Sequence, residues 1–199
     1  MAPPFRQQID EGILDQAAAL FARRGFTKTS VQDVADAVGL SKAGLLHHYA
    51  SKETLYRSVL TQAGVLGQRV LGSVGELPPG PERDRRALEV LVDVALAHPG
   101  MVALLLAPIT QGDQNRQAPE LEAVGAAALQ AFGVDPGAPA SERAIRVLGA
   151  LAALAVLSLT AHQEDDTTRW RASIIATCFD ALGHSRPGVA LPDHHQVEA

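Results

Sequence analysis

The sequence predicts an all-α protein of about nine helices. Apolar residues recur at the i, i+3, i+4, i+7 spacing of a helix in most segments, and no segment shows the strict alternation of a half-buried strand. Aromatic residues make up only 4% of the 199 residues, and alanine and leucine dominate the 47% that are hydrophobic. Because sheets favour β-branched and aromatic residues, this composition favours helices.

Length and cysteine content bound the class of protein. The length allows one or two compact domains with a hydrophobic core. The single cysteine, Cys178, cannot form an internal disulfide, and no basic and apolar leader opens the chain, so we expect a cytoplasmic protein. The longest apolar run, residues 147–161, contains Ser158 and Thr160 and is short for a bilayer, so we predict a buried helix and no membrane partner.

The first predicted helix covers residues 6–24. Its apolar residues share one face, acidic residues lie near its start, and Arg23 and Arg24 lie near its end. Both placements agree with the helix dipole, and Gly25 follows where the helix would stop.

Two short predicted helices come next and meet at a glycine. The first carries an apolar stripe over residues 31–38, and Gly39 follows where a helix stop needs a residue that tolerates positive φ. Ser41 offers a side-chain oxygen to cap the second helix, and Leu45 would lock it against the first. A steep crossing with glycine in the turn is typical of a helix-turn-helix, which makes double-stranded DNA the first partner to consider.

The later elements are separated by clear breaks. Ser51 is expected to cap a long fourth helix that runs to Val74, and the proline-rich segment 77–81 ends it. Further helices are predicted at 82–97, 101–109, 120–132, 141–161 and 168–182, with a polar loop at 111–119. We therefore expect a helix-turn-helix domain over 1–52, a second helical domain over 53–184 and a flexible tail over 185–199.

The net charge of −5 would by itself disfavour a nucleic-acid partner. Residues 1–60, however, contain seven Lys or Arg against six Asp or Glu, so the acidic excess lies in the rest of the chain. A helix-turn-helix needs only a local positive face, because salt screens charges beyond roughly 8–10 Å.

A set of residues in the first third of the chain carries a family resemblance. These residues are Gly25-Phe26, Thr29-Ser30-Val31, Asp33-Val34-Ala35, residues 38–42, His48-Tyr49 and residues 51–55. With three helices and a long fourth, they resemble the tetracycline-repressor (TetR) family of transcriptional regulators. The resemblance implies a homodimer that binds operator DNA, with an effector pocket and the dimer interface in a variable C-terminal region.

The resemblance also implies which residues contact DNA. Ser41 and Lys42 would begin the helix that enters the major groove, where the small Ala43 and Gly44 permit close approach. Thr29 would open the preceding helix and offer its hydroxyl to a phosphate. The remaining expected contacts are His47, to a base edge or phosphate, and His48, Tyr49 and Lys52, to the DNA backbone.

Two features of the recognition helix bear on this assignment. Many relatives carry an aromatic residue at the position of Leu46, and leucine offers no hydroxyl to phosphate, so the contacts at Leu46 and His47 do not carry over directly. His47 and His48 also suggest a metal pair, but neighbouring helical residues point about 100° apart. We therefore predict DNA contact, with no metal and no cofactor.

Other motifs have simpler interpretations. Residues 39–43 imitate a nucleophile elbow, but a helix and not a strand precedes the serine. The acidic residues 164–166 indicate a solvated loop, and Cys178 is expected in the core because no basic neighbour stabilises a thiolate. No metal-ligand spacing, phosphate-binding glycine loop or pair of catalytic carboxylates is present in the sequence, so we predict no catalytic residues and no enzyme.

Two apolar helices near the end of the chain favour a dimer interface over purely internal burial. The residues assigned to it are Leu148, Leu151, Ala152, Ala155, Leu159, Ile174, Cys178 and Phe179. The residues assigned to an effector pocket are Met101, Leu105, Ile109, Phe132 and Trp170, with His98, Gln111 and Thr160 as polar anchors, although residues of these types more often simply belong to a core.

These observations predict a dimeric repressor that binds a near-palindromic operator and is released when a small molecule shifts the fourth helix. The identity of that effector is beyond the sequence. The alternative is a ligand-independent or partner-controlled DNA-binding regulator, which would have a solid C-terminal core in place of a cavity.

Overall fold

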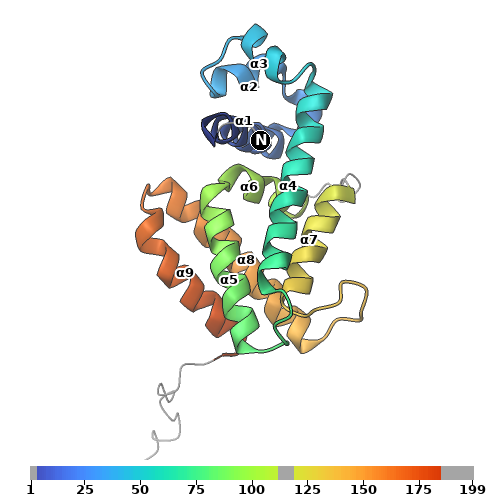
Figure 1. Ribbon diagram of the computed structural model, residues 1–199, viewed down its shortest axis with the longest axis vertical. Helices are drawn as coiled ribbons and strands as arrows, with labels where there is room; N and C mark the ends of the chain where they lie inside the picture. The colour runs from blue at the N-terminus through green and yellow to red at the C-terminus, as the bar shows by residue number, and fades with distance from the viewer. Residues whose placement is uncertain (1–3, 112–118, 185–199) are drawn as a thin grey trace, which may run out of the picture.

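The computed structural model describes residues 4–111 and 119–184 (Figure 1). Within these ranges the chain forms nine helices and no strand, which confirms the predicted all-α class. The helices are α1 (Pro4–Lys28), α2 (Val31–Ala37), α3 (Lys42–His48), α4 (Lys52–Val74), α5 (Pro81–Ala97), α6 (Pro99–Gln111), α7 (Pro119–Ala131), α8 (Glu142–Gln163) and α9 (Thr167–Ala181). The predicted tail and most of the predicted polar loop lie outside the described residues.

Helix α4 connects the two ends of the molecule. In Figure 1, α1 to α3 lie at one end of the long axis, and α4 runs from them into the body formed by α5 to α9. Leu55 and Leu66 of α4 belong to an upper hydrophobic core, whereas Val70 and Val74 belong to a lower one. Helix α4 is therefore a structural element that both cores share.

The upper core joins α1 directly to the body. Ala17 and Ala18 of α1 are fully buried, and Phe21 packs edge-on against Tyr56 with 5.0 Å between ring centroids. The same core continues into α6 through Met101 and into α7 through Leu121 and Val124. The helix-turn-helix unit is thus docked on the body through α1.

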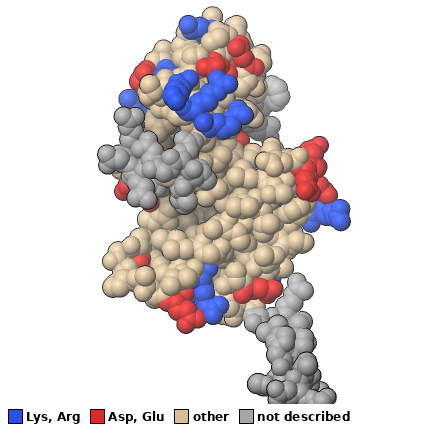
Figure 2. Space-filling model, turned by 180° about the vertical axis from the view of Figure 1, so that it is seen from behind, with Lys and Arg blue, Asp and Glu red and all other residues tan. Residues whose placement is uncertain are grey.

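Helix α8 is not the buried helix that the sequence predicts. Only 28% of its most apolar 18-residue window is buried, and this is the one described helix that is by itself long and apolar enough to cross a membrane. Its exposed residues Ile145, Leu148, Ala152 and Val156 follow one helical face, which we call the α8 stripe. α8 runs behind α5 in Figure 1, and the view from behind shows a broad face of the body with few charged side chains (Figure 2).

Cys178 lies in the lower core, as the sequence predicts. Its thiol is fully buried and donates a hydrogen bond to the carbonyl oxygen of Ala150 at 3.4 Å. Burial raises the pKa of the thiol to about 11.

We expect Cys178 to resist alkylation by iodoacetamide at pH 8 in the native protein, because the thiol is both covered and protonated. In denaturant it should react at the rate of a free cysteine. Mass spectrometry after timed quenching measures both rates. Native alkylation within tenfold of the denatured rate would contradict this burial.

Candidate nucleic-acid interface

Helix α2 is capped by Ser30 and not by Thr29. The backbone N–H of Asp33 donates to Ser30 Oγ at 3.1 Å, and the backbone N–H of Ser30 donates to Asp33 Oδ2 at 2.8 Å. Arg24 pairs with Asp33 at 2.8 Å. Hydrogen bonds from Ser30, followed by the contact with Arg24, lower the pKa of the Asp33 carboxyl. The Ser-x-x-Asp spacing is the sequence signal of this capping box.

Thr29 therefore has a structural role, and the prediction that its hydroxyl meets a phosphate is wrong. Only 1% of the residue is exposed, and its hydroxyl donates to the carbonyl oxygen of Gly25 at 2.9 Å. Gly25 has φ +77° and marks the bend at which the helix leaves its axis. The buried hydroxyl of Thr29 thus stabilises the bend at Gly25 by this hydrogen bond.

Helix α3 presents a short polar face at the end of the molecule. The backbone N–H of Gly44 donates to Ser41 Oγ at 3.0 Å, which confirms the predicted cap. Leu45 is fully buried and fixes α3 against the neighbouring helices, whereas Lys42 and Ala43 are exposed. His47 is also exposed, on the same short helix.

His48 and Tyr49 face α1. The Nδ1 atom of His48 lies 3.2 Å from Oδ1 of Asp10. Burial, with a smaller contribution from Asp10, raises the pKa of the Tyr49 hydroxyl to about 12. Both side chains therefore lie at the junction of α1 and α3. If they contact the DNA backbone, they do so while they also interact with Asp10.

Lys52 points inward at the first turn of α4. Its ammonium donates to the carbonyl oxygens of Phe26 at 2.9 Å and Thr27 at 3.5 Å, and lies 4.3 Å from the centre of the Phe26 ring. Sequence reasoning missed this role because Phe26 is 26 residues away. Lys52 holds the segment that follows the bend at Gly25, near the end of α1, and this contact competes with the predicted phosphate contact.

The end of the molecule that carries α1 to α3 is also where basic side chains gather (Figure 2). Exposed Arg23, Arg24 and Lys28 at the end of α1 add to Lys42 of α3. In the part of the chain that the structure describes, no group of three or more His, Cys, Asp or Glu side chains could hold a metal ion.

The predicted effector-pocket residues that the structure describes are divided between the two hydrophobic cores. Met101 is buried in the upper core and Phe132 in the lower core. Leu105 packs on the upper core and Trp170 on the lower one, and the Thr160 hydroxyl donates to the carbonyl oxygen of Val156 at 3.0 Å. The side chains of Ile109 and Gln111 lie outside the described residues. Met101 and Phe132 thus belong to different cores, and His98 lines a separate hollow between α1 and the body.

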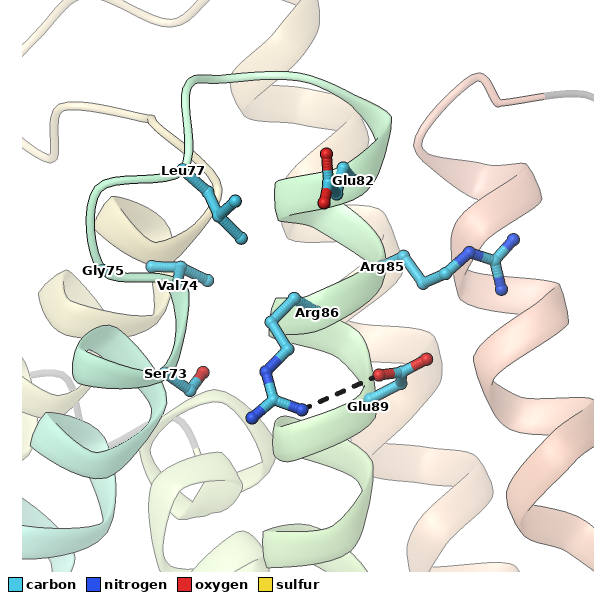
Figure 3. Close-up of a pocket in the computed structure, with 8 residues that line it drawn as sticks. All are labelled: Ser73, Val74, Gly75, Leu77, Glu82, Arg85, Arg86 and Glu89. Carbon is cyan, nitrogen blue, oxygen red and sulfur yellow. Dashed lines mark ion pairs between the residues drawn. The ribbon is translucent and has the colours of Figure 1, made fainter.

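Two hollows are described instead. A groove of about 310 Å³ lies between the end of α4 and the start of α5, where Arg86 lies 4.0 Å from Glu89 (Figure 3). A larger hollow of about 490 Å³, which we call the junction cleft, lies between α1 and the body. It is lined by Glu11, Gly12, Asp15, Gln16, Arg69, Ala97, His98, Pro99 and His162.

The predicted dimer residues divide between surface and core. Leu148 and Ala152 are exposed on the α8 stripe, and Leu151, Ala155 and Leu159 are partly exposed. Ile174 and Cys178 are buried in the lower core, so their assignment to an interface is wrong. The ring of Phe179 is covered by the Arg85 guanidinium, 4.4 Å from its centre. Sequence periodicity identified the apolar helices but not which face turns outward.

Comparison with known proteins places the matched region at this N-terminal end. Residues 13–59 match the family model of bacterial regulatory proteins of the tetR family. The HTH-type transcriptional repressor KstR2 of Rhodococcus jostii is 40% identical over 80 residues, which is 40% of this chain and 38% of the repressor. The chain thus matches well under half the length of that relative.

Solved structures with the same fold cover more of the chain. A TetR-family regulator of Rhodococcus sp. aligns with a TM-score of 0.54 and 17% identity over 88% of this chain and 99% of that one. The TetR-family regulator PfmR of Thermus thermophilus aligns with a TM-score of 0.50 and 24% identity over 86% of this chain and 97% of that one. At these identities the likeness concerns the fold. The curated relatives are named as transcriptional regulators, in agreement with the prediction that the chain is not an enzyme.

Proposed function

We propose that this chain, which belongs to the TetR family of transcriptional regulators, is a repressor that binds a near-palindromic operator as a homodimer. The single observation that carries the proposal is the exposed face of α3, set at the end of the molecule by a buried Leu45 and a Ser41 cap. Such a face fits the major groove, whose width admits one helix. Residues 1–52 would form the DNA-binding domain and residues 53–184 the regulatory and dimerisation domain.

The proposed contacts follow the exposed side of α3. Lys42 would pair with a phosphate, Ala43 and Gly44 would allow the helix to approach the bases, and His47 would reach a base edge or phosphate. Ser41 would hold the helix end through its cap. His48 and Tyr49 would touch the DNA backbone from the α1 junction, and Lys52 would act by fixing the bend at Gly25, near the end of α1.

The α8 stripe supports the dimer. An exposed row of large apolar residues on a soluble regulator marks an interaction surface. A second copy packed on it would bring two α3 helices to one side of the assembly. Half-sites about one helical turn of DNA apart would then fit the pair.

Release by a small molecule would act through α4 and α1, the two helices that join the upper core to the body. The scattered positions of Met101 and Phe132 favour the second candidate, a ligand-independent regulator with a solid lower core. A coupling free energy of about 1–3 kcal/mol would distinguish them, because it lowers operator affinity 5- to 150-fold.

The direct test is selection of bound fragments from random double-stranded DNA, followed by operator titration at several salt concentrations. Lys42→Ala should weaken binding about tenfold or more and reduce the salt slope of log K by about 2, since a dimer loses two phosphate contacts. Arg86→Ala, in the groove at the far end of α4, is the matched control and should change neither quantity. Failure to select any sequence, or an equal loss of affinity in both variants, would refute the proposal that the exposed face of α3 binds DNA.

A further inference from the structure

The junction cleft lies at the joint between the helix-turn-helix unit and the body. Its walls come from α1, α4, the turn between α5 and α6, and the end of α8. Its volume of about 490 Å³ falls within the roughly 300–1,000 Å³ of small-molecule sites. An occupant would touch α1 and the body at the same time.

The contact beside the cleft is tight. The Asp15 carboxylate of α1 accepts hydrogen bonds from the backbone N–H groups of Gly100 and Met101 at 3.0 Å each. A Cβ atom at Gly100 would lie 1.9 Å from the carbonyl oxygen of Asp15, so α1 rests directly on the first turn of α6. A ligand that moves α1 away from the body must break these hydrogen bonds. It must also displace the α1 residues that pack in the upper core.

The cleft offers side-chain donors that make no hydrogen bond within the described chain. The side chains of Arg69, His98 and His162 form no hydrogen bond or ion pair with any described residue. Arg69 also feels the charge of Asp93, but Arg171 already holds that carboxylate through two hydrogen bonds. A guanidinium with imidazoles beside it is a donor set that recognises an oxyanion.

The acidic residues of the wall restrict the charge of that anion. Burial raises the pKa of the Asp15 carboxyl, while the N–H groups of Gly100 and Met101, and then His98 and His162, oppose the rise. Glu11 adds a second carboxyl group to the wall. A phosphate, with about −1.5 to −2 charges, would be repelled more strongly than a singly charged carboxylate. The apolar residues of the wall, Gly12, Ala97 and Pro99, suit a short aliphatic chain.

We propose that the junction cleft binds a small aliphatic monocarboxylate through Arg69, and that this ligand separates α1 from α6 and weakens operator binding. The second half of this proposal rests on the proposed repressor function, whereas the first half does not. Gly12 makes a sharp test possible, because a Cβ atom built there meets nothing within 4 Å. A leucine at this position adds bulk to the cleft wall, keeps every charge and favours the helix.

Binding is measured first without DNA, by calorimetric titration of the full chain with acetate, butyrate and hexanoate, and with phosphate as the contrasting anion. We expect saturable binding of at least one carboxylate, weakened tenfold or more in both Arg69→Gln and Gly12→Leu. Arg86→Gln, in the groove of Figure 3, should bind as the wild type does. Absence of saturable binding, equal binding by Arg69→Gln, or tighter binding of phosphate would overturn the site.

Operator affinity is then measured with and without the carboxylate that binds. We expect a loss of fivefold or more in the wild type and no change in Gly12→Leu. Binding that leaves operator affinity unchanged would overturn the regulatory half alone. A protein that binds carboxylate but no DNA would refute the repressor function and leave the ligand site standing.

Discussion

Asp84→Asn is expected to lower the free energy of unfolding by about 3–5 kcal/mol, the usual cost of removing one partner from a buried ion pair. The Asp84 side chain is fully buried at the start of α5, and its two oxygens lie 2.6 and 2.7 Å from Nη2 of Arg143. The imidazole of His184 lies 2.6 Å from the same carboxylate. One carboxylate therefore joins α5, the start of α8 and the segment after α9.

The loss has a clear physical origin. The asparagine amide keeps the shape of the carboxylate but has one acceptor oxygen in place of two and no charge, so Arg143 loses its counter-charge and keeps the carbonyl oxygen of Phe132, 3.0 Å away. Arg143 keeps 34% of its side chain exposed, so water recovers part of its solvation and the loss should fall toward the lower end of the range. For a chain of this length the melting temperature should fall by about 6–12 °C.

Asp93→Asn provides the matched control on the same helix. Asp93 also binds an arginine through two hydrogen bonds, but 50% of its side chain is exposed, as is 43% of its partner Arg171. Surface pairs of this kind contribute about 0–1 kcal/mol. Urea denaturation followed by circular dichroism measures both variants. Equal losses would show that burial does not set the strength of the Asp84 cluster.

Local features of the fold could be predicted because their causes lie within a few residues. Ser41 and Ser51 cap α3 and α4 through the N–H group three residues later, as the sequence indicates, and Ser141 caps α8 in the same way. Thr29 and Ser30 show the limit of this reasoning. Both can cap a helix, and only the fold decides that Thr29 turns inward to Gly25 while Ser30 pairs with Asp33.

Features set by contacts distant in sequence could not be predicted. Asp84 finds its partners 59 and 100 residues further along the chain, and Lys52 finds Phe26 on a different helix. Gly100 lets α6 approach α1, 85 residues away in sequence, and the junction cleft lies beside this contact. The periodicity of apolar residues along one helix does not indicate which residues of other helices it contacts. The pocket prediction rests on the apolar faces of single helices and therefore does not include the cleft between α1 and the body.

Val156→Glu is expected to convert the proposed dimer into monomers and to lower operator affinity about 100-fold or more. Val156 lies on the α8 stripe with 57% of its surface exposed, so a glutamate there does not disturb the folded monomer. Pairing two stripes would bury two unpaired carboxylates next to Leu148 and Ile145, at a cost of several kcal/mol each. Separate monomers lose the 10²- to 10⁴-fold gain that comes from joining two half-site contacts.

Val65→Glu is the matched control, because Val65 on α4 has the same residue type and the same 57% exposure but lies outside the stripe. Sedimentation velocity at micromolar concentration should show a dimer for the wild type and Val65→Glu, and a monomer for Val156→Glu. In operator titration, the wild type and Val65→Glu should bind with the same affinity, and Val156→Glu should bind more weakly. A Val156→Glu protein that remains dimeric would place the interface on another face. A monomeric variant with full operator affinity would mean that one copy reads the DNA alone.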